Sequence, residues 1–345
     1  MSQKMMKAGV LGPSEHFAVQ EWPIPVPGDD EILLRVHACG VCQSEVSRWK
    51  LGANAKDYPF DENVLDWEIA QRQKKPGTNS RKYPALMGHE PSGEIMAVGK
   101  NVTNLKPGMH AVALGSRSFA EYGTYPATFV HPIQPSTPFE QALGEPIACV
   151  YNAAQRANVR AGDKVVLVGC GFMGLMLLQI MRLANPEVIV AIDVRDDALA
   201  VASKVGADVI VNSLREDVIE VVRKAVGPKG ATVVVEAIGK QVGLDIATQL
   251  VGWNGRIAIV GYHQGEPRSV DVGTWNVKGI DVVNAHERHI HVYFLGMVGG
   301  ITLLEEGKLD MKTLVTHTYP LDRIDDAFHQ SADKPQGFIK AVVMP

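Results

Sequence analysis

The sequence is poor in cysteine. Its 345 residues include only Cys39, Cys42, Cys149 and Cys170. Four cysteines at such uneven spacings do not form the disulfide framework that supports many small secreted domains. The first seven residues are also too polar for the apolar region of a secretory signal. Both features predict a reduced, cytoplasmic protein.

Long apolar runs and an excess of one charge are missing as well. No stretch reaches the roughly 18 consecutive apolar residues that a membrane-spanning helix requires. The 34 basic and 38 acidic side chains give a formal net charge of −4, so no basic excess favours nucleic acid or anionic lipid. With 46% hydrophobic residues, the chain is expected to be globular, and its length suits two domains.

The chain changes character near residue 150. Before it, proline is frequent, and apolar runs at 32–36 and 111–114 are bounded by turn residues, as in β-strands. After it, six short apolar runs alternate with helical segments. These runs are 165–168, 188–192, 209–211, 233–235, 257–260 and 280–283. Their alternation predicts an α/β fold with a doubly wound parallel sheet of the Rossmann type. We expect this domain at 151–285 and a β-rich domain at 1–150 and 286–345.

A glycine-rich turn follows the first of these runs and precedes a helix. It reads Gly169-Cys170-Gly171-Phe172-Met173-Gly174, which is G-x-G-x-x-G. In this context the first glycine permits a tight turn, the second lets the backbone approach a pyrophosphate, and the third allows close helix–strand packing. The free N–H groups at the helix start, those of Phe172 and Met173 among them, then hold the phosphates. The competing interpretation is a tight turn that binds no ligand.

An acidic residue ends the second run. Asp193 follows Gly174 by 19 residues, close to the spacing of a carboxylate that binds the adenosine ribose. A carboxylate there repels a 2′-phosphate, so NAD is expected rather than NADP. Arg195 keeps the alternative open, because its guanidinium suits a 2′-phosphate.

Zinc-binding side chains occur in two short motifs. Residues 40–45 contain Cys42 and Ser44, and residues 88–93 contain His89 and Glu90. Thiolate and imidazole are preferred zinc ligands, and a carboxylate can complete the set. Cys42 and His89 are 47 residues apart, so only the fold can bring them together.

These motifs resemble those of the zinc-dependent medium-chain alcohol dehydrogenase family, nearest to its polyol and sorbitol dehydrogenase branch. The family pattern is matched by Gly88-His89-Glu90 with Gly93, Gly99 and Val102, and residues 40–45 resemble G-x-C-x-S-[DE]. Further matches are Pro107-Gly108, 119–122, Glu145-Pro146, 161–165, 205–208 and 337–340. The similarity runs almost end to end and fails only between residues 49 and 83.

The resemblance implies a GroES-like catalytic domain beside the Rossmann domain. It also implies that Cys42 and His89 bind zinc and that Glu145 stands where relatives have the third ligand. Glu90 can exchange with Glu145, and Cys149 ranks well below Glu145. In relatives, the residues matching Ser44 and Lys340 receive the substrate proton and approach the cofactor pyrophosphate, respectively.

One residue and three stretches depart from relatives or stay open. Ser47 stands where many relatives have a histidine that completes the proton relay. Residues 111–129 lack the cysteines of a structural zinc lobe, so one catalytic zinc per chain is expected. Residues 49–83 form a longer loop, with a helix expected over 61–74, which is either a lid, an oligomer contact or a tolerated insertion. The polar cluster 286–291 suggests a cleft contact or a helix start rather than a second metal site.

The expected function is that of a zinc-dependent oxidoreductase that transfers hydride from a secondary hydroxyl of a polyol, sugar or cyclitol to NAD. One alternative is a dehydrogenase of a simple secondary alcohol or of threonine. Another is a non-catalytic sensor that binds NAD(H). The expected partner is another copy of the chain, in a dimer or tetramer joined through the edge strand 280–283, and neither nucleic acid nor membrane.

Overall fold

The computed structural model describes residues 4–13, 16–51, 84–263 and 267–345, in two compact units. Unit 1 comprises residues 1–148, 288–305 and 315–345, and unit 2 comprises residues 149–287 and 306–314. The helix expected over 61–74, and most of the loop around it, lie outside the described residues. Among those described, no helix combines the length and the apolar character needed to cross a bilayer.

Unit 2 is built on a six-stranded parallel sheet. Its strands are β9 (Lys164–Val168), β10 (Val188–Asp193), β11 (Val209–Asn212), β12 (Ala231–Glu236), β13 (Val251–Ile259) and β14 (Asp281–Asn284). Side chains 165–168 on the central strand β9 are completely buried, as expected of a strand covered on both faces. The sheet order β11-β10-β9-β12-β13-β14 confirms the predicted doubly wound sheet.

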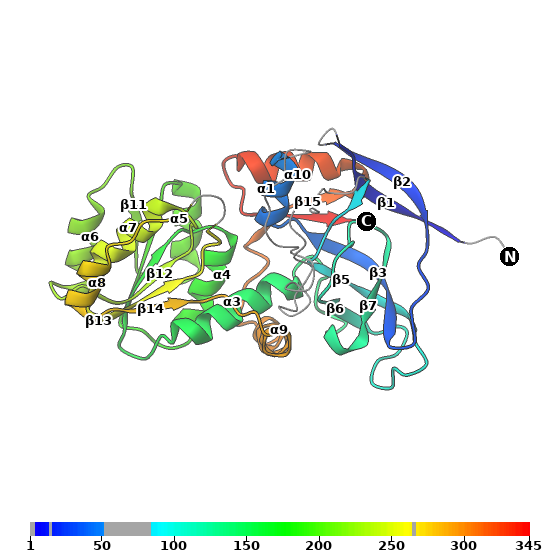
Figure 1. The fold of residues 1–345 in the computed structure, drawn as a ribbon, viewed down its shortest axis with the longest axis horizontal. Coiled ribbons are helices and arrows are strands. Elements are labelled where there is room, and N and C mark those ends of the chain that lie inside the picture. The colour runs from blue at the N-terminus through cyan, green and yellow to red at the C-terminus, as the bar shows by residue number, and fades with distance from the viewer. Residues whose placement is uncertain (1–3, 14–15, 52–83, 264–266) are drawn as a thin grey trace. The chain divides into compact units, whose positions relative to one another are not determined.

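Helices cover both faces of this sheet (Figure 1). They are α4 (Phe172–Arg182), α5 (Asp196–Lys204), α6 (Val218–Val226), α7 (Gln241–Leu250) and α8 (Val272–Lys278). The strand order runs one way from β9 to β11 and the other way from β12 to β14. Right-handed crossovers therefore put α4 and α5 on one face and α6 and α7 on the other. The reversal between β9 and β12 is the point where such sheets bind ligands, at the carboxyl ends of the strands.

Residues 306–314 belong to unit 2, although the sequence predicted them with the β-rich domain. Leu309, Met311 and Leu314 are buried there. The backbone N–H of Asp310 also donates to Gln179 Oε1 on α4, at 2.6 Å. Apolar burial and this hydrogen bond hold the segment against unit 2.

Unit 1 is the β-rich part of the chain, which confirms the predicted fold class. A seven-stranded sheet contains β15 (Val315–Pro320), β16 (Lys340–Met344), β3 (Glu31–Gly40), β5 (Pro91–Val98), β6 (His110–Ala113) and β8 (Val130–Pro132), with β7 (Tyr122–Pro126) paired to β3. A smaller sheet has the order β2 (Phe17–Pro23), β1 (Met5–Leu11) and β4 (Ala85–Leu86). The last strand, β16, pairs with β3, so the C-terminal strand lies beside the end of the strand that leads to Cys42.

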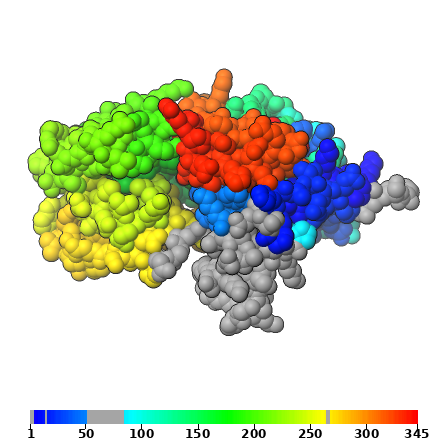
Figure 2. All heavy atoms as spheres, turned by 90° about the horizontal axis from the view of Figure 1, so that it is seen from above, coloured from blue at the N-terminus to red at the C-terminus, as the bar shows by residue number. Residues whose placement is uncertain are grey.

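Helices and an aromatic cluster complete unit 1. The helices are α1 (Gln43–Leu51), α9 (Ile290–Glu305), α10 (Ile324–Asp333) and the short η2 (Ala127–Phe129) and η3 (Leu321–Arg323). The fully buried ring of Phe328 contacts the rings of Trp49 and Phe119. This packing joins α1 to α10, seen in Figure 2 as light blue against red. Helix α3 (Gly144–Ala157) begins at Gly144 and places Glu145 in its first turn.

Candidate active site

Three potential metal ligands come together in unit 1. Cys42 follows β3, while His89 and Glu90 immediately precede β5. Because β3 pairs with β5 through Cys39 and Pro91, the two segments are neighbours. The Cys42 sulfur, a His89 ring nitrogen and a Glu90 carboxylate oxygen all lie within 4.8 Å of one another. Within the described residues, no other set of three or more such side chains is this close, the cluster 286–291 included.

The donor set fits zinc. Ligand atoms about 2.0–2.3 Å from a tetrahedral zinc lie about 3.5 Å apart, so a small contraction would bring these three atoms to ligating distance. Three protein ligands leave the fourth position for a substrate, which is the arrangement of catalytic rather than structural zinc. Glu90 is fully buried, whereas the side chain of His89 is 20% exposed, which leaves the cluster accessible from one side.

A second carboxylate orients His89. Glu45, in the first turn of α1, has its Oε1 atom 3.2 Å from His89 Nδ1, and it accepts a 2.7 Å hydrogen bond from the backbone N–H of Gly88. A carboxylate on one ring nitrogen fixes the imidazole and directs the other nitrogen to a metal. Burial opposes the charged imidazole, but Glu45 and Cys42 raise the pKa of His89 well above its ordinary value. The sequence did not predict this role for Glu45, although Glu45 ends the motif at 40–45.

Glu90 forms a buried ion pair with Lys340. The ammonium lies 2.8 Å from Glu90 Oε1 and 2.7 Å from Oε2, and it donates to the carbonyl oxygen of Val41 at 2.9 Å. Burial raises the pKa of Glu90 despite this neighbour. Burial also disfavours the charged form of Lys340, but Glu90 and Cys42 raise its pKa. The sequence predicted that Lys340 approaches the cofactor pyrophosphate. The structure places its ammonium beside Glu90, one of the three potential metal ligands, so contact with a pyrophosphate stays a prediction.

Glu145 lies beside the cluster but outside the group of three. Its Oε1 atom accepts a 2.6 Å hydrogen bond from the Tyr293 hydroxyl on α9. Its charge contributes to the raised pKa values of Glu90 and Lys340, which shows that it is near both. Tyr293 was not predicted, because a tyrosine within an apolar helical segment carries no signal of its partner.

The two serines of this region have different partners. The Ser44 hydroxyl donates to the Cys42 sulfur at 3.3 Å, which places it next to the metal cluster. The Ser47 hydroxyl instead donates to the carbonyl oxygen of Gln43 at 3.0 Å, within α1. In this structure, Ser47 therefore stabilises its own helix.

The glycine-rich turn of unit 2 has the geometry of a phosphate-binding turn. Gly169 follows β9 with φ of +105°, a conformation that favours glycine. Gly171 is the N-cap of α4, so the N–H groups of Phe172 and Met173 belong to the unpaired first turn of that helix. A Cβ atom on Gly174 would collide with the carbonyl oxygen of Gly169, which explains the close helix–strand approach.

Asp193 lies next to this turn. It is the last residue of β10, and its Oδ2 atom accepts a 2.7 Å hydrogen bond from the backbone N–H of Cys170. Its Oδ1 atom accepts from the backbone N–H groups of Val194 and Arg195, at 2.8 and 3.0 Å. The Arg195 guanidinium lies 3.8 Å from the Asp197 carboxylate. Both predicted cofactor residues therefore border the turn.

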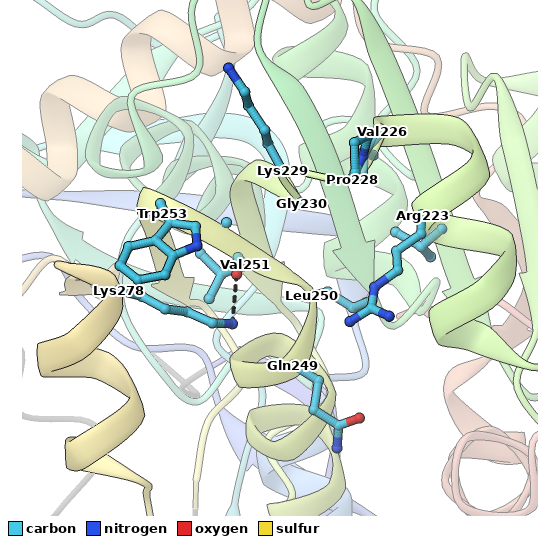
Figure 3. A pocket seen from close by; sticks show the side chains of 12 residues that line it. Arg223, Val226, Pro228, Lys229, Gly230, Gln249, Leu250, Val251, Trp253 and Lys278 are labelled. Carbon is cyan, nitrogen blue, oxygen red and sulfur yellow. Dashed lines mark hydrogen bonds between the residues drawn. The ribbon is translucent and has the colours of Figure 1, made fainter.

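A pocket of about 140 Å³ in unit 2 includes none of the predicted site residues (Figure 3). It lies where α6 and α7 end and β12 and β13 begin, at the amino edge of the sheet. Lys278 donates there to the carbonyl oxygens of Thr248 and Val251, at 3.0 and 2.9 Å. A cation at the end of a helix is stabilised by its unpaired carbonyl groups, so Lys278 is explained as a cap of α7.

Comparisons with known proteins agree with this architecture. Residues 28–135 match the family model described as the alcohol dehydrogenase GroES-like domain, and residues 173–297 match that of the zinc-binding dehydrogenase. The chain is 26% identical to human sorbitol dehydrogenase, over 92% of this chain and 90% of that protein. It is also 26% identical to an L-threonine 3-dehydrogenase of Symbiobacterium thermophilum, over 100% and 99% of the two chains. A structure from Sinorhizobium meliloti 1021, described as a zinc-binding dehydrogenase bound to NADP, has a TM-score of 0.83 at 23% identity and covers 99% of this chain and 100% of that one.

Replacing Cys42 with serine should lower the affinity for zinc at least about 100-fold, because the thiolate ligand is lost. Zinc per chain, measured by mass spectrometry after dialysis, tests this. Cys39→Ala is the control, since Cys39 lies three residues earlier outside the group of ligands. Undiminished zinc in Cys42→Ser would remove Cys42 from the site.

Replacing Lys340 with methionine should destabilise unit 1 by about 3–5 kcal/mol in chelator-treated protein, because a buried carboxylate loses its counter-charge. The double variant Lys340→Met/Glu90→Gln should recover much of this loss, since no unpaired charge remains. Urea unfolding measures both variants. Equal losses in the single and double variants would contradict a role for the ion pair.

Proposed function

The chain belongs to the zinc-dependent medium-chain alcohol dehydrogenase family, and from this membership we propose that it oxidises a secondary hydroxyl of a polyol, sugar or cyclitol with NAD. The observation that carries the proposal is the close grouping of Cys42, His89 and Glu90. The glycine-rich turn with Asp193 supports a dinucleotide as the hydride acceptor. The family makes the chain an oxidoreductase, while the substrate and the choice of NAD are the proposed part.

Cys42, His89 and Glu90 would hold one zinc ion per chain, with Glu145 behind them. Bound there, zinc supplies a Lewis acid that polarises the substrate oxygen. Glu45 keeps His89 oriented, and Lys340 offsets the charge of Glu90. The Tyr293 hydroxyl donates to Glu145 Oε1, which fixes one oxygen of this carboxylate.

Ser44 is the proposed acceptor of the substrate proton. Its hydroxyl donates to the sulfur of the proposed ligand Cys42, so it would lie near an alcohol bound to a metal held there. A bound nicotinamide would supply the acceptor for the hydride of the carbinol carbon, and Ser44 would take the hydroxyl proton. The hydroxyl of Ser47 is bonded to its own helix, so we assign it no part in the relay.

Two observations support a polyhydroxylated substrate. A Glu-Pro pair at 145–146 stands where the polyol branch has its carboxylate. A curated relative, human sorbitol dehydrogenase, is aligned over most of both chains. An L-threonine 3-dehydrogenase is equally similar in identity, which makes threonine the second candidate. A protein that binds NADH but no metal would instead be a sensor.

The assembly proposed is a homo-oligomer, either tetramer or dimer, in the cytoplasm. Strand β14 lies at one edge of the unit 2 sheet, and among the described residues only β13 pairs with it. Such an edge can pair with the same edge of a second copy.

The test of the proposed function is metal content together with NAD reduction on a panel of polyols, sugars, cyclitols, simple secondary alcohols and threonine. We expect about one zinc per chain and turnover on at least one polyhydroxylated compound. Turnover restricted to threonine or simple alcohols would replace the proposed substrate class. NADH binding without zinc, and without activity after zinc is added, would favour the sensor.

Replacing Asp193 with alanine should raise the Kd for NADH about tenfold, since a hydrogen-bonding carboxylate at the ribose position is lost. NADPH should be affected less, because the repulsion of its 2′-phosphate is removed as well. Fluorescence titration with both cofactors measures this, with zinc content as the control. An unchanged Kd for NADH would place the ribose elsewhere.

A further inference from the structure

Topology indicates which loops of unit 2 face each half of a dinucleotide. The glycine-rich turn after β9 and Asp193 after β10 belong to the first half of the sheet, which takes the adenosine half. The second half of the sheet comprises β12, β13 and β14, on the other side of the switch point. The loops that follow these strands therefore face the nicotinamide and its ribose.

Glu236 joins two of these loops. It is the last residue of β12 and is fully buried. Its Oε1 atom accepts hydrogen bonds from the backbone N–H groups of Ile238 and Gly239, at 2.8 and 2.7 Å. Its Oε2 atom lies 2.9 Å from His263 Nε2, in the loop after β13. This carboxylate fixes the turn after β12 and holds the imidazole of the next loop.

The backbone of the second loop is fixed as well. The N–H groups of Val260 and Gly261 both donate to the carbonyl oxygen of Glu236, at 2.8 Å each. His263 therefore extends from a segment that is anchored at both its backbone and its side chain. The side chain is 17% exposed, so most of it is shielded from water.

The other ring nitrogen of His263 has no hydrogen-bond partner among the described residues. A carboxylate only accepts hydrogen bonds, so the proton of the neutral ring is on Nε2, and Nδ1 is left as an acceptor. Nδ1 is buried, and no group of the described chain donates to it. A buried acceptor without a donor costs free energy, which a bound ligand with an N–H or O–H group would recover.

We propose that His263 Nδ1 accepts a hydrogen bond from the nicotinamide-ribosyl half of the cofactor, with Glu236 as the residue that positions the ring and sets its tautomer. The inference rests on the proposed function. The donor is the carboxamide N–H or a ribose hydroxyl, and NAD and NADP share both groups. His263 thus recognises the half of the cofactor that carries the hydride, separately from Asp193.

The experiment compares binding of NADH, ADP-ribose and AMP by calorimetry in wild-type protein, His263→Gln and His263→Asn. The glutamine amide can still reach Glu236 but offers no acceptor at the Nδ1 position, whereas asparagine retains an oxygen near that position. We expect His263→Gln to raise the Kd for NADH about tenfold, and His263→Asn to restore part of it. AMP binding should not change in either variant.

ADP-ribose distinguishes the two donors. A loss with NADH alone identifies the carboxamide, and a loss with both NADH and ADP-ribose identifies the ribose. An unchanged Kd for NADH in His263→Gln overturns the inference while the proposed function stands. An equal loss with AMP also overturns it, since the variant then disturbs the whole unit. If wild-type protein binds neither NADH nor NADPH, the proposed function fails first.

The role of Glu236 has its own readout. Glu236→Gln presents an amide N–H to the ring and should move the proton of His263 from Nε2 to Nδ1, which the imidazole ¹⁵N chemical shifts report. With Nδ1 turned into a donor, NADH should bind about tenfold more weakly. A changed tautomer with unchanged NADH binding would overturn the role of Nδ1.

Discussion

The buried ion pair between Glu90 and Lys340 is the interaction on which the metal cluster depends. Several acidic side chains gather in one largely buried region, namely those of Cys42, Glu45, Glu90 and Glu145. The ammonium of Lys340 lies among them. It comes from β16, the last strand of the chain, which pairs with β3 just before Cys42. The pairing of the C-terminal strand β16 with β3 therefore does more than complete the core, because it places the positively charged Lys340 beside Glu90.

A different constraint organises unit 2. Parallel strands all end at one edge of the sheet, so residues that follow separate strands gather there without any close sequence relation. Asp193 after β10, the glycine-rich turn after β9 and Glu236 at the end of β12 all occupy this edge. The amino edge shows the contrast, since its pocket is lined by cations, one of which caps a helix.

Features that depend on neighbouring residues could be predicted from the sequence, whereas contacts between residues far apart in the sequence could not. The parallel sheet and the glycine-rich turn were predicted because apolar runs, glycines and a following helix are contiguous signals, and the family motifs identified Cys42 and His89. The partners of Glu90 and Glu145 were not predicted. Lys340 and Tyr293 lie 250 and 148 residues away from them, and only the pairing of β16 with β3 and the docking of α9 bring them together.

Burial and neighbouring charges shift the pKa values of two of the three potential metal ligands. Burial raises the pKa of Glu90, and the acidic groups around His89 raise its pKa although burial alone would lower it. Both shifts favour the protonated form, that of Glu90 through burial and that of His89 through its acidic neighbours. A divalent cation would offset the negative charge of these groups and displace those protons, because metal ligands bind in their deprotonated forms. A cation at Cys42, His89 and Glu90 would therefore suit the charge distribution of this region.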